Sequence, residues 1–303
     1  MNRFLFCALL LVLTPGAQSQ PSQPTAPQRS AQQPVQKPLP TEARAVLDEA
    51  RAVAAAARSS YETYHPDQPL FREAIRLGRR AVFLAPENPE ALRFLAELYG
   101  VTGFYGPAFG IWQRYARAGG PLDAAAKDQL AAAGTQVGYA RYTQGDLTGA
   151  LSAFRTVTRL EPGSVRAWRW SGRILLEQNN PRAALPFWRR VQGLRPGDPG
   201  AAYFVTLSEA GVRHGVGAAR AFYGGVADYE AGRRRAARAA FTRATDLAPD
   251  YAEAWGYRGR LAFEAGNFAA AAAAYARAAG LAPQNETYRY FLQQARSRQA
   301  PAD

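Results

Sequence analysis

One spacing of small and aromatic residues recurs in this chain of 303 residues and limits what it can fold into. Its clearest copies run over Ala167–Pro196 and Ala254–Pro283. In both, Trp is followed by Gly after four residues, then Ala after twelve, an aromatic residue after four and Pro after eight. The residues are Trp168, Gly172, Ala184, Trp188 and Pro196 in the first copy and Trp255, Gly259, Ala271, Tyr275 and Pro283 in the second. A unit this short cannot bury its own apolar face, so successive units must stack.

The spacing resembles the tetratricopeptide repeat, whose units are pairs of antiparallel helices. The resemblance implies an all-α fold, namely a right-handed superhelical α-solenoid of helix pairs with a C-terminal cap helix. It also implies that the protein binds another macromolecule. We expect the small residues where the two helices of a pair touch, because larger side chains would push the helix axes beyond about 8–10 Å. The aromatic residues should fill the gap between units, and each Pro should end a second helix.

Weaker copies extend the pattern along most of the chain. We predict a solenoid over 42–299 with about six helix pairs and a polar cap helix at 286–299. A pair between the two clear copies is marked by Gly232, Ala237 and Phe241. The prolines that end the last units are spaced by 34, 53 and 34 residues, at Pro162, Pro196, Pro249 and Pro283. The wider gap predicts an extra or irregular helix near 200–217, which is either a hinge or a degenerate repeat.

The N-terminus has the order of features typical of a secretory signal peptide. Arg3 precedes an apolar run, Phe4–Leu13, that is too short to span a membrane as a helix. A Pro-Gly pair then breaks the run, and Ala17–Ser19 has the small-x-small pattern of a cleavage site. We predict a signal peptide at 1–19 that is cleaved after Ser19, and an uncleaved membrane anchor is the alternative. The protein is then exported to the periplasm or cell envelope, with an extracellular location as a further option.

The segment that follows, 20–41, is rich in Pro and Gln and is predicted to be a linker without a core. Cys7 is the only cysteine and lies inside the apolar run, where a lipid-modified cysteine is not expected. After cleavage the chain would have no cysteine, which excludes disulfides and cysteine-based metal sites.

The chain is strongly basic, with 37 Lys and Arg against 24 Asp and Glu, and a net charge of +13. Such a surface attracts anionic partners: acidic peptides, anionic glycans, lipid head groups or nucleic acid. The alternative is an Arg-rich composition spread over solvated helix faces. The Arg233–Arg235 run at the start of a predicted helix is either an anion site or a solvated run of charges, and we interpret it as solvated.

Residues that could carry chemistry are sparse. His65 and His214 are the only histidines, and neither has Asp, Glu or Cys at the spacing of a metal site. We expect both on the surface or in loops. The chain has no G-x-S-x-G motif and no phosphate-binding loop. The sequence therefore predicts no cofactor, no metal and no enzymatic activity.

In the tetratricopeptide family, the residues of each first helix that lie between packing positions line a concave groove. Carried over by repeat phase, the resemblance implies a groove rich in Tyr, Trp and Arg, the residue types most frequent at binding hot spots. The candidates are Tyr139, Tyr142, Arg166, Arg169, Trp170, Arg173, Tyr223, Tyr229, Tyr257 and Arg260, with Gln136, Phe222, Val226 and Phe263 beside them. For Phe222, Phe263 and Tyr139, packing against neighbouring helices is the alternative.

Together these features predict an exported, non-enzymatic scaffold in a bacterial cell envelope. It would hold an extended or acidic segment of a protein or peptide partner during assembly of an envelope, secretion or pilus complex. A binder of anionic or neutral cell-wall glycan is the first alternative, with an anionic wall polymer as one candidate ligand, and a nucleic-acid binder is the second. The sequence does not name the partner or the oligomeric state.

Overall fold

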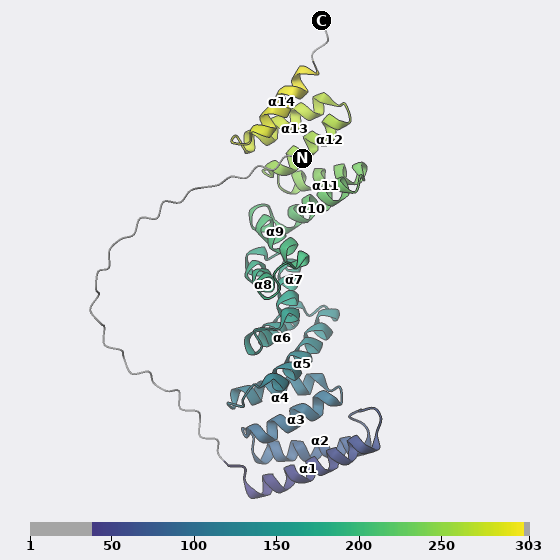
Figure 1. Cartoon of the computed structure of the whole chain (residues 1–303), viewed down its shortest axis with the longest axis vertical. Coiled ribbons are helices and arrows are strands. Elements are labelled where there is room, and N and C mark those ends of the chain that lie inside the picture. Colours follow the sequence, from purple (N-terminus) through teal and green to yellow (C-terminus); the bar gives the residue numbers. More distant parts are fainter. Residues whose placement is uncertain (1–37, 300–303) are drawn as a thin grey trace, which may run out of the picture. The chain divides into compact units, whose positions relative to one another are not determined.

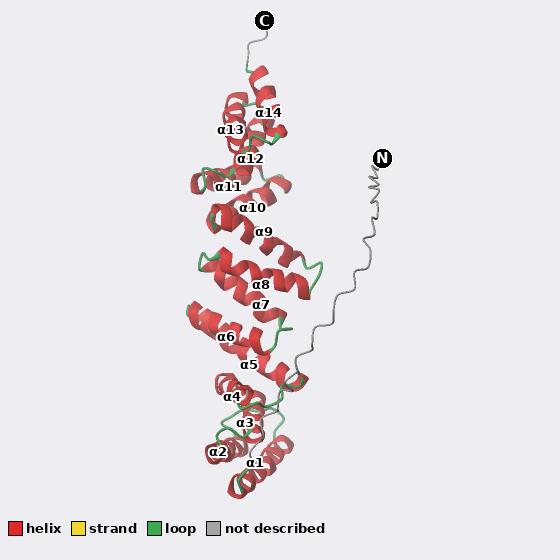
Figure 2. Ribbon diagram, turned by 90° about the vertical axis from the view of Figure 1, so that its left-hand side faces the viewer, coloured by secondary structure: helices red, strands yellow, loops and turns green. Residues whose placement is uncertain are grey.

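The computed structural model describes residues 38–299, and every regular element in that range is an α-helix (Figures 1 and 2). The helices are α1 (Thr41–Ser60), α2 (Pro69–Leu84), α3 (Pro89–Val101), α4 (Tyr105–Arg117), α5 (Ala124–Thr143), α6 (Leu147–Leu160), α7 (Val165–Glu177), α8 (Pro181–Leu194), α9 (Pro199–His214), α10 (Val216–Glu230), α11 (Arg234–Leu247), α12 (Ala252–Glu264), α13 (Phe268–Leu281) and α14 (Glu286–Ser297). Each helix packs mainly against its neighbours in the chain, as expected for a repeat array. The prediction of an all-α solenoid is confirmed, while its right-handed sense stays a prediction.

Twelve of these helices form six pairs, α1–α2, α3–α4, α5–α6, α7–α8, α10–α11 and α12–α13. The other two, α9 and α14, each pack on the second helix of the preceding pair. The signal peptide at 1–19 lies outside the described residues, as does nearly all of the linker at 20–41. The far end of that linker needs a correction: Leu39 is buried together with Ala43 and Leu47, because it leads directly into α1. Among residues 38–299, no helix is long and apolar enough to cross a membrane.

The close approach within a pair depends on glycine. Gly172 of α7 lies directly against Trp188 of α8, where an added Cβ would be 2.6 Å from the indole nitrogen. Gly259 and Tyr275 repeat this contact in α12 and α13, with the nearest ring carbon 2.9 Å from the added Cβ. These two predicted packing glycines therefore lie where the sequence placed them.

Gly232 has a different role from the one predicted. It lies in the turn between α10 and α11 with φ of 75°, and an added Cβ would have no neighbour within 4 Å. Glycine is favoured at this position because the backbone is in the left-handed conformation, which glycine adopts without a steric penalty. The packing glycine of this pair is Gly225, whose added Cβ would be 2.8 Å from Phe241.

Aromatic rings join four of the pairs to the helix that follows them in a regular way. The buried ring on the second helix stacks on an aromatic ring sixteen residues later, at ring distances of 4.2 to 5.7 Å. The four stacked pairs are Phe154–Trp170, Trp188–Phe204, Phe241–Tyr257 and Tyr275–Phe291. The aromatic residues thus do fill the space between units. The remaining repeat tryptophans, Trp168 and Trp255, each donate an indole N–H to the carbonyl of a unit-ending proline at 3.0 Å.

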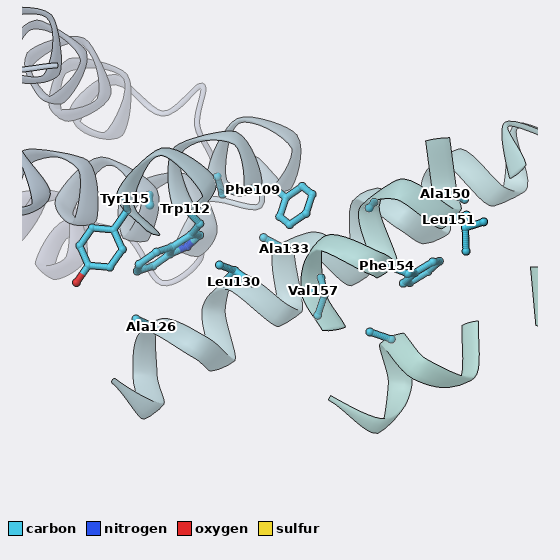
Figure 3. Close-up of a cluster of buried hydrophobic side chains, with 14 of the residues drawn as sticks. Phe109, Trp112, Tyr115, Ala126, Leu130, Ala133, Ala150, Leu151, Phe154 and Val157 are labelled. Atoms are coloured by element: carbon cyan, nitrogen blue, oxygen red, sulfur yellow. The ribbon is translucent and has the colours of Figure 1, made fainter. Parts of the chain in front are cut away.

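The core between α4, α5 and α6 shows how these contacts combine (Figure 3). Phe109 and Val157 approach Gly134 from the two sides, and an added Cβ there would be within 2.6 Å of both. Trp112 and Tyr115 are essentially fully buried beside Leu130. Glycine at this position lets α5 lie in contact with α4 and α6 at the same time.

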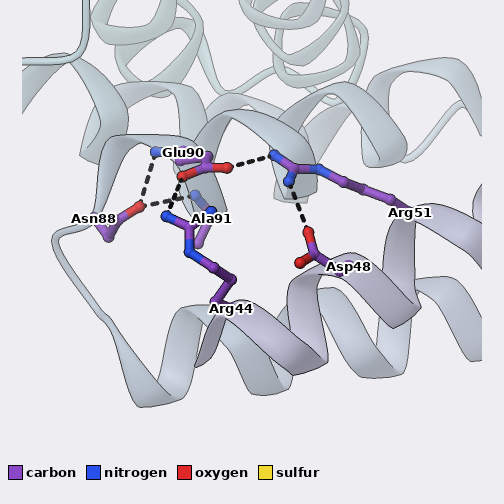
Figure 4. A network of polar contacts seen from close by, with 6 residues as sticks. All are labelled: Arg44, Asp48, Arg51, Asn88, Glu90 and Ala91. Carbon is purple, nitrogen blue, oxygen red and sulfur yellow. Dashed lines mark hydrogen bonds and ion pairs between the residues drawn. The ribbon is translucent and has the colours of Figure 1, made fainter. Parts of the chain in front are cut away.

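Side-chain caps define where half of the described helices begin. Asn88 accepts hydrogen bonds from the backbone N–H groups of Glu90 and Ala91 at 3.0 and 3.2 Å (Figure 4). Glu90 in turn forms ion pairs with Arg44 and Arg51 of α1, at 3.5 and 2.9 Å. Similar caps begin six other helices, at Asp123, Asp146, Asn180, Asp198, Asn267 and Asn285. Each such cap stabilises its helix by about 1 kcal/mol.

The cap at Asp123 gives a pH-dependent prediction. Its carboxylate accepts hydrogen bonds from Arg93 at 2.6 Å and from the Ala126 N–H at 2.8 Å. The Arg93 contact, followed by the Ala126 bond, lowers the pKa of Asp123. The stabilisation is therefore complete above the unfolded pKa of about 3.9 and is lost as the pH falls through the lower folded pKa.

Replacing Asp123 by Asn keeps the cap and removes the charge. We expect the variant to be less stable than the wild type at neutral pH, with a difference that shrinks below about pH 4. Urea unfolding at a series of pH values measures this. Asp246→Asn is the control, because Asp246 is exposed and forms no ion pair within 38–299. A difference that persists unchanged at the lowest pH would contradict the Arg93 contact as its cause.

Candidate binding site

A cluster of aromatic and charged side chains lies where α5 meets α7. The Trp170 ring contacts Tyr139 and Tyr142, with ring distances of 5.7 and 4.9 Å. The Arg173 guanidinium lies 5.1 Å from the Trp170 ring and 5.7 Å from the Tyr142 ring, within cation–π range. Glu177 accepts hydrogen bonds from the Tyr142 hydroxyl at 2.9 Å and from Arg173 Nε at 3.0 Å. We call Tyr142, Trp170, Arg173 and Glu177 the first cluster.

The hydrogen bonds hold this cluster in one arrangement. The bond to Glu177, followed by burial, raises the pKa of Tyr142, so its hydroxyl remains a donor at neutral pH. The same carboxylate raises the pKa of Arg173. With Glu177 occupied on one side, the guanidinium edges of Arg173 that face away from it are available to a ligand.

The first cluster borders an open pocket of about 640 Å³ that is lined by residues of four helices. They are Arg169, Trp170, Arg173, Leu176 and Glu177 of α7, Trp188 of α8, Phe204 of α9 and Arg220 of α10. Arg169 is paired with Asp198, whereas Arg220 is exposed and forms no ion pair within 38–299. The pocket therefore combines an aromatic floor with an arginine rim, which suits a segment that carries both apolar and acidic side chains.

The same arrangement recurs 87 residues later in the chain. Tyr229, Tyr257, Arg260 and Glu264 occupy the equivalent positions of α10 and α12, and we call them the second cluster. Glu264 accepts hydrogen bonds from the Tyr229 hydroxyl and from Arg260 Nε, the latter at 3.1 Å. Burial, followed by the bond to Glu264, raises the pKa of Tyr229. The chain thus contains two copies of one Tyr–Arg–Glu arrangement.

The structure divides the predicted groove residues into several groups. Tyr139 is 49% exposed, so it is available to a ligand. Trp170 and Tyr257 also serve packing, because each stacks on the second helix of the preceding pair. Arg166 is exposed near the start of α7 and does not line the pocket. Tyr223 is half-buried against Tyr203 and Phe222, and burial raises its pKa.

Two further expectations concern packing. Phe222 is buried in the core with Phe241 and Tyr257, and the half-buried Phe263 contacts Phe268 and Phe291. For these two residues the packing alternative is the correct one. Gln136 is exposed on α5, and Val226 is half-buried on α10.

The surface expectation for His214 is wrong. Its side chain is only 11% exposed, stacks on the Tyr251 ring at 3.9 Å and lies 3.6 Å from Asp250. The reason is its place at the end of α9, where the chain turns beside the start of α12. His65 is exposed in the loop before α2, as expected. Within residues 38–299, no group of His, Cys, Asp and Glu is arranged to hold a metal ion.

The acidic partners, Glu177 and Glu264, were not predicted from the sequence, and neither were the pocket residues contributed by later helices, Phe204 and Arg220. A signal for the glutamates was present. The spacings from Tyr142 to Arg173 and Glu177 are identical to those from Tyr229 to Arg260 and Glu264. Nothing in a linear pattern places Phe204 and Arg220 beside Trp170, because that depends on how α9 and α10 stack.

A comparison with known protein families finds repeats at the same separation as the two clusters. A family model described as tetratricopeptide repeat matches residues 137–199 and 224–286, two segments of equal length that are also 87 residues apart. The chain therefore carries tetratricopeptide repeats in both segments, and proteins with this repeat bind peptide or protein partners. No curated protein matches the chain as a whole or in part.

Several solved structures are similar to the chain at low identity. The pilF protein of Pseudomonas aeruginosa is 16% identical, with 84% of this chain and 98% of that chain covered and a TM-score of 0.28. A tetratricopeptide repeat protein from Parabacteroides merdae is 12% identical, with 84% and 99% covered and a TM-score of 0.35. YrrB, described as a TPR protein with an unusual peptide-binding site, is 14% identical, with 81% and 89% covered and a TM-score of 0.20. Scores this low support no inference about function.

Proposed function

We propose that the protein is an exported, non-enzymatic scaffold that holds an extended segment of a partner protein in the bacterial cell envelope. The observation that carries the proposal is the first cluster at the border of its open pocket, repeated in the second cluster. Two copies of one polar and aromatic arrangement, 87 residues apart, suit a partner segment that crosses several helices.

The chemistry of the pocket supports a segment with both apolar and acidic residues. Trp170 and Phe204, which are half-buried, offer ring surface on which an apolar side chain or a proline can pack. Arg173 and Arg220 can each present two N–H groups to a carboxylate. Arginine and aromatic side chains together are the usual composition of an interface hot spot.

The location of this activity rests on the N-terminal sequence. The apolar run Phe4–Leu13 and the cleavage pattern Ala17–Ser19 support export and removal of the signal peptide. Assembly of an envelope, secretion or pilus complex is the role that we propose there. The Pro- and Gln-rich residues that follow would separate the solenoid from the point of export.

The test is affinity capture from the native cell envelope with the chain that begins at Gln20. In one variant, Tyr139→Ala removes an exposed ring that contacts Trp170 of the first cluster, and Arg173→Ala removes the guanidinium of that cluster. In the matched control, Tyr290→Ala and Arg243→Ala remove the same groups from exposed positions on α14 and α11. Circular dichroism must first show equal folding.

We expect the wild type and the control to capture the same protein, and the site variant to lose most of it. Capture of that protein by all three would show that the partner binds elsewhere. Capture of cell-wall polymer in place of a protein would favour the glycan alternative. Added salt should then weaken the binding steeply.

A further inference from the structure

The second helices of the six pairs start with a common arrangement, and α11 departs from it. Each of these helices has a buried alanine near its start, and we number that alanine as the fourth position. In five of the six helices, the first and fifth positions are then apolar or aromatic. The first positions are Phe71, Tyr105, Leu147, Pro181 and Phe268, and the fifth are Ile75, Phe109, Leu151, Leu185 and Ala272. In α11 the same two positions are Arg234 and Arg238.

In three of the other helices the fifth position is buried, and in α2 and α8 it is half-buried. Phe109 is 6% exposed and lies against Gly134 of the next pair, and Leu151 and Ala272 are each 8% exposed. Arg238 is exposed, and its place is an open pocket of about 380 Å³ between α11 and α12. The lining residues are Arg234, Arg235 and Arg238 with Leu261, Glu264 and Ala265. The fifth position of α11 is thus an exposed arginine beside an open pocket, whereas it is apolar and buried or half-buried in the other five helices.

The charges in this basic pocket are unbalanced. Arg234 stacks on the Tyr229 ring at 4.0 Å and pairs with Glu264 at 3.5 Å. That carboxylate, the only acid in the lining, is already shared with Arg260 and the Tyr229 hydroxyl. Arg235 and Arg238 form no ion pair or side-chain hydrogen bond with any residue in 38–299. Two guanidinium groups are therefore left without a counter-charge from this part of the chain.

The arrangement differs from the solvated run that the sequence suggested. A solvated run occupies outward positions and leaves the packing residues in place. Here Arg238 replaces a residue that is buried or half-buried in the other five pairs, which costs contact area with α12. A basic composition alone does not account for that choice of positions.

We propose that this basic pocket binds the carboxylates of an acidic segment of the partner protein. The proposal rests on the proposed function, because Arg234 and Glu264 connect the pocket to the second cluster. The apolar walls of Leu261 and Ala265 suit a peptide side chain beside a carboxylate. Nucleic acid would instead need phosphate contacts along an extended path, whereas this patch is confined to the start of one helix.

Synthetic peptides test the proposal directly. The probes are a labelled peptide of repeated Glu-Glu-Ala units, its Gln-Gln-Ala counterpart and a single-stranded oligonucleotide, each titrated with the chain from Gln20. The pocket variant carries Arg235→Ala and Arg238→Leu, the latter giving α11 the leucine of α6 and α8. The control carries Arg243→Ala and Arg277→Ala, which remove two exposed arginines outside the pocket and the same net charge.

We expect the Glu peptide to bind the wild type and the control, and to bind the pocket variant about tenfold more weakly. The Gln peptide should bind none of them measurably. Thermal unfolding gives an independent readout. The midpoint of the Arg238→Leu single variant should rise by about 2–4 °C, because leucine can pack on Leu261.

Absence of Glu-peptide binding to the wild type would overturn the proposal, as would equal weakening in the pocket variant and the control. Tighter binding of the oligonucleotide with the same dependence on Arg235 and Arg238 would overturn the choice of an acidic peptide. Each of these results leaves the proposed function intact if the Tyr139 and Arg173 variant still loses its partner. If instead the variant with Tyr139→Ala and Arg173→Ala keeps its partner, that result counts against the proposed function.

Discussion

Replacing Phe154 by Ala is expected to lower the free energy of unfolding by about 3–5 kcal/mol. The Phe154 ring is fully buried, lies against Gly138 within its own pair and stacks on Trp170 of the next pair at 5.7 Å. Its removal leaves a cavity at both contacts, and a glycine and a stacked indole can fill little of it. Urea unfolding followed by circular dichroism measures the change.

Phe83→Ala is the matched control, because Phe83 lies on α2 and is 81% exposed. It should change the free energy of unfolding by no more than about 0.5 kcal/mol. Equal losses in the two variants would contradict the view that the ring of the second helix joins one pair to the next.

Two adjacent glycines of α10 should respond in opposite directions to the same substitution. An added Cβ at Gly225 would be 2.8 Å from the buried Phe241 ring, so Gly225→Ala forces the helices apart and should destabilise by about 1–3 kcal/mol. An added Cβ at Gly224 would meet nothing within 4 Å. Gly224→Ala should therefore stabilise by about 0.5–1 kcal/mol, because alanine favours the helix.

Unfolding midpoints of the two single variants measure both effects in one experiment. The comparison is internal, since each variant serves as the control of the other. If both variants lose stability, alanine destabilises α10 in general, and contact with Phe241 is not the cause. A gain in both would mean that Gly225 is not in close contact with Phe241.

The sequence predicted the helix pairs well because their packing follows fixed spacings. Gly172 was expected where the two helices of a pair touch, and it lies there against Trp188 of the second helix. The role of Gly232 was predicted less well, because a glycine in a repeat can serve a turn or a helix contact. Only the backbone conformation, with φ of 75°, shows which of the two applies.

The irregular region near 200–217 has a simple structural description. Helix α9 occupies the place that α14 has 87 residues later, and both stack an aromatic ring on the preceding pair, through Phe204 and Phe291. The two helices differ at a second set of equivalent positions. Leu207 and Ala210 are buried in the core that continues into α10, whereas the equivalent residues, Gln294 and Ser297, are polar. A linear spacing shows the extra residues but not this equivalence.

The binding residues were only partly predictable for a related reason. A helical pattern places Trp170 and Arg173 on one helix, but it does not show that the face of the indole stacks on Phe154. The glutamate that fixes Arg173 lies four residues further along and belongs to none of the residue types expected at a hot spot. Aligning the second helices places Arg238 where α6 and α8 have Leu151 and Leu185, but the pocket that it forms with Leu261 and Ala265 appears only in three dimensions.

The most direct test of the proposed scaffold function is the dissociation constant of the captured partner segment, measured by calorimetry. The wild type, the variant with Tyr139→Ala and Arg173→Ala, and the control with Tyr290→Ala and Arg243→Ala are compared at one salt concentration. We predict binding at least about tenfold weaker for the site variant and unchanged for the control, because an aromatic ring and a guanidinium at a hot spot each contribute more than about 1 kcal/mol. Equal dissociation constants for all three proteins would contradict the assignment of the first cluster as the binding site.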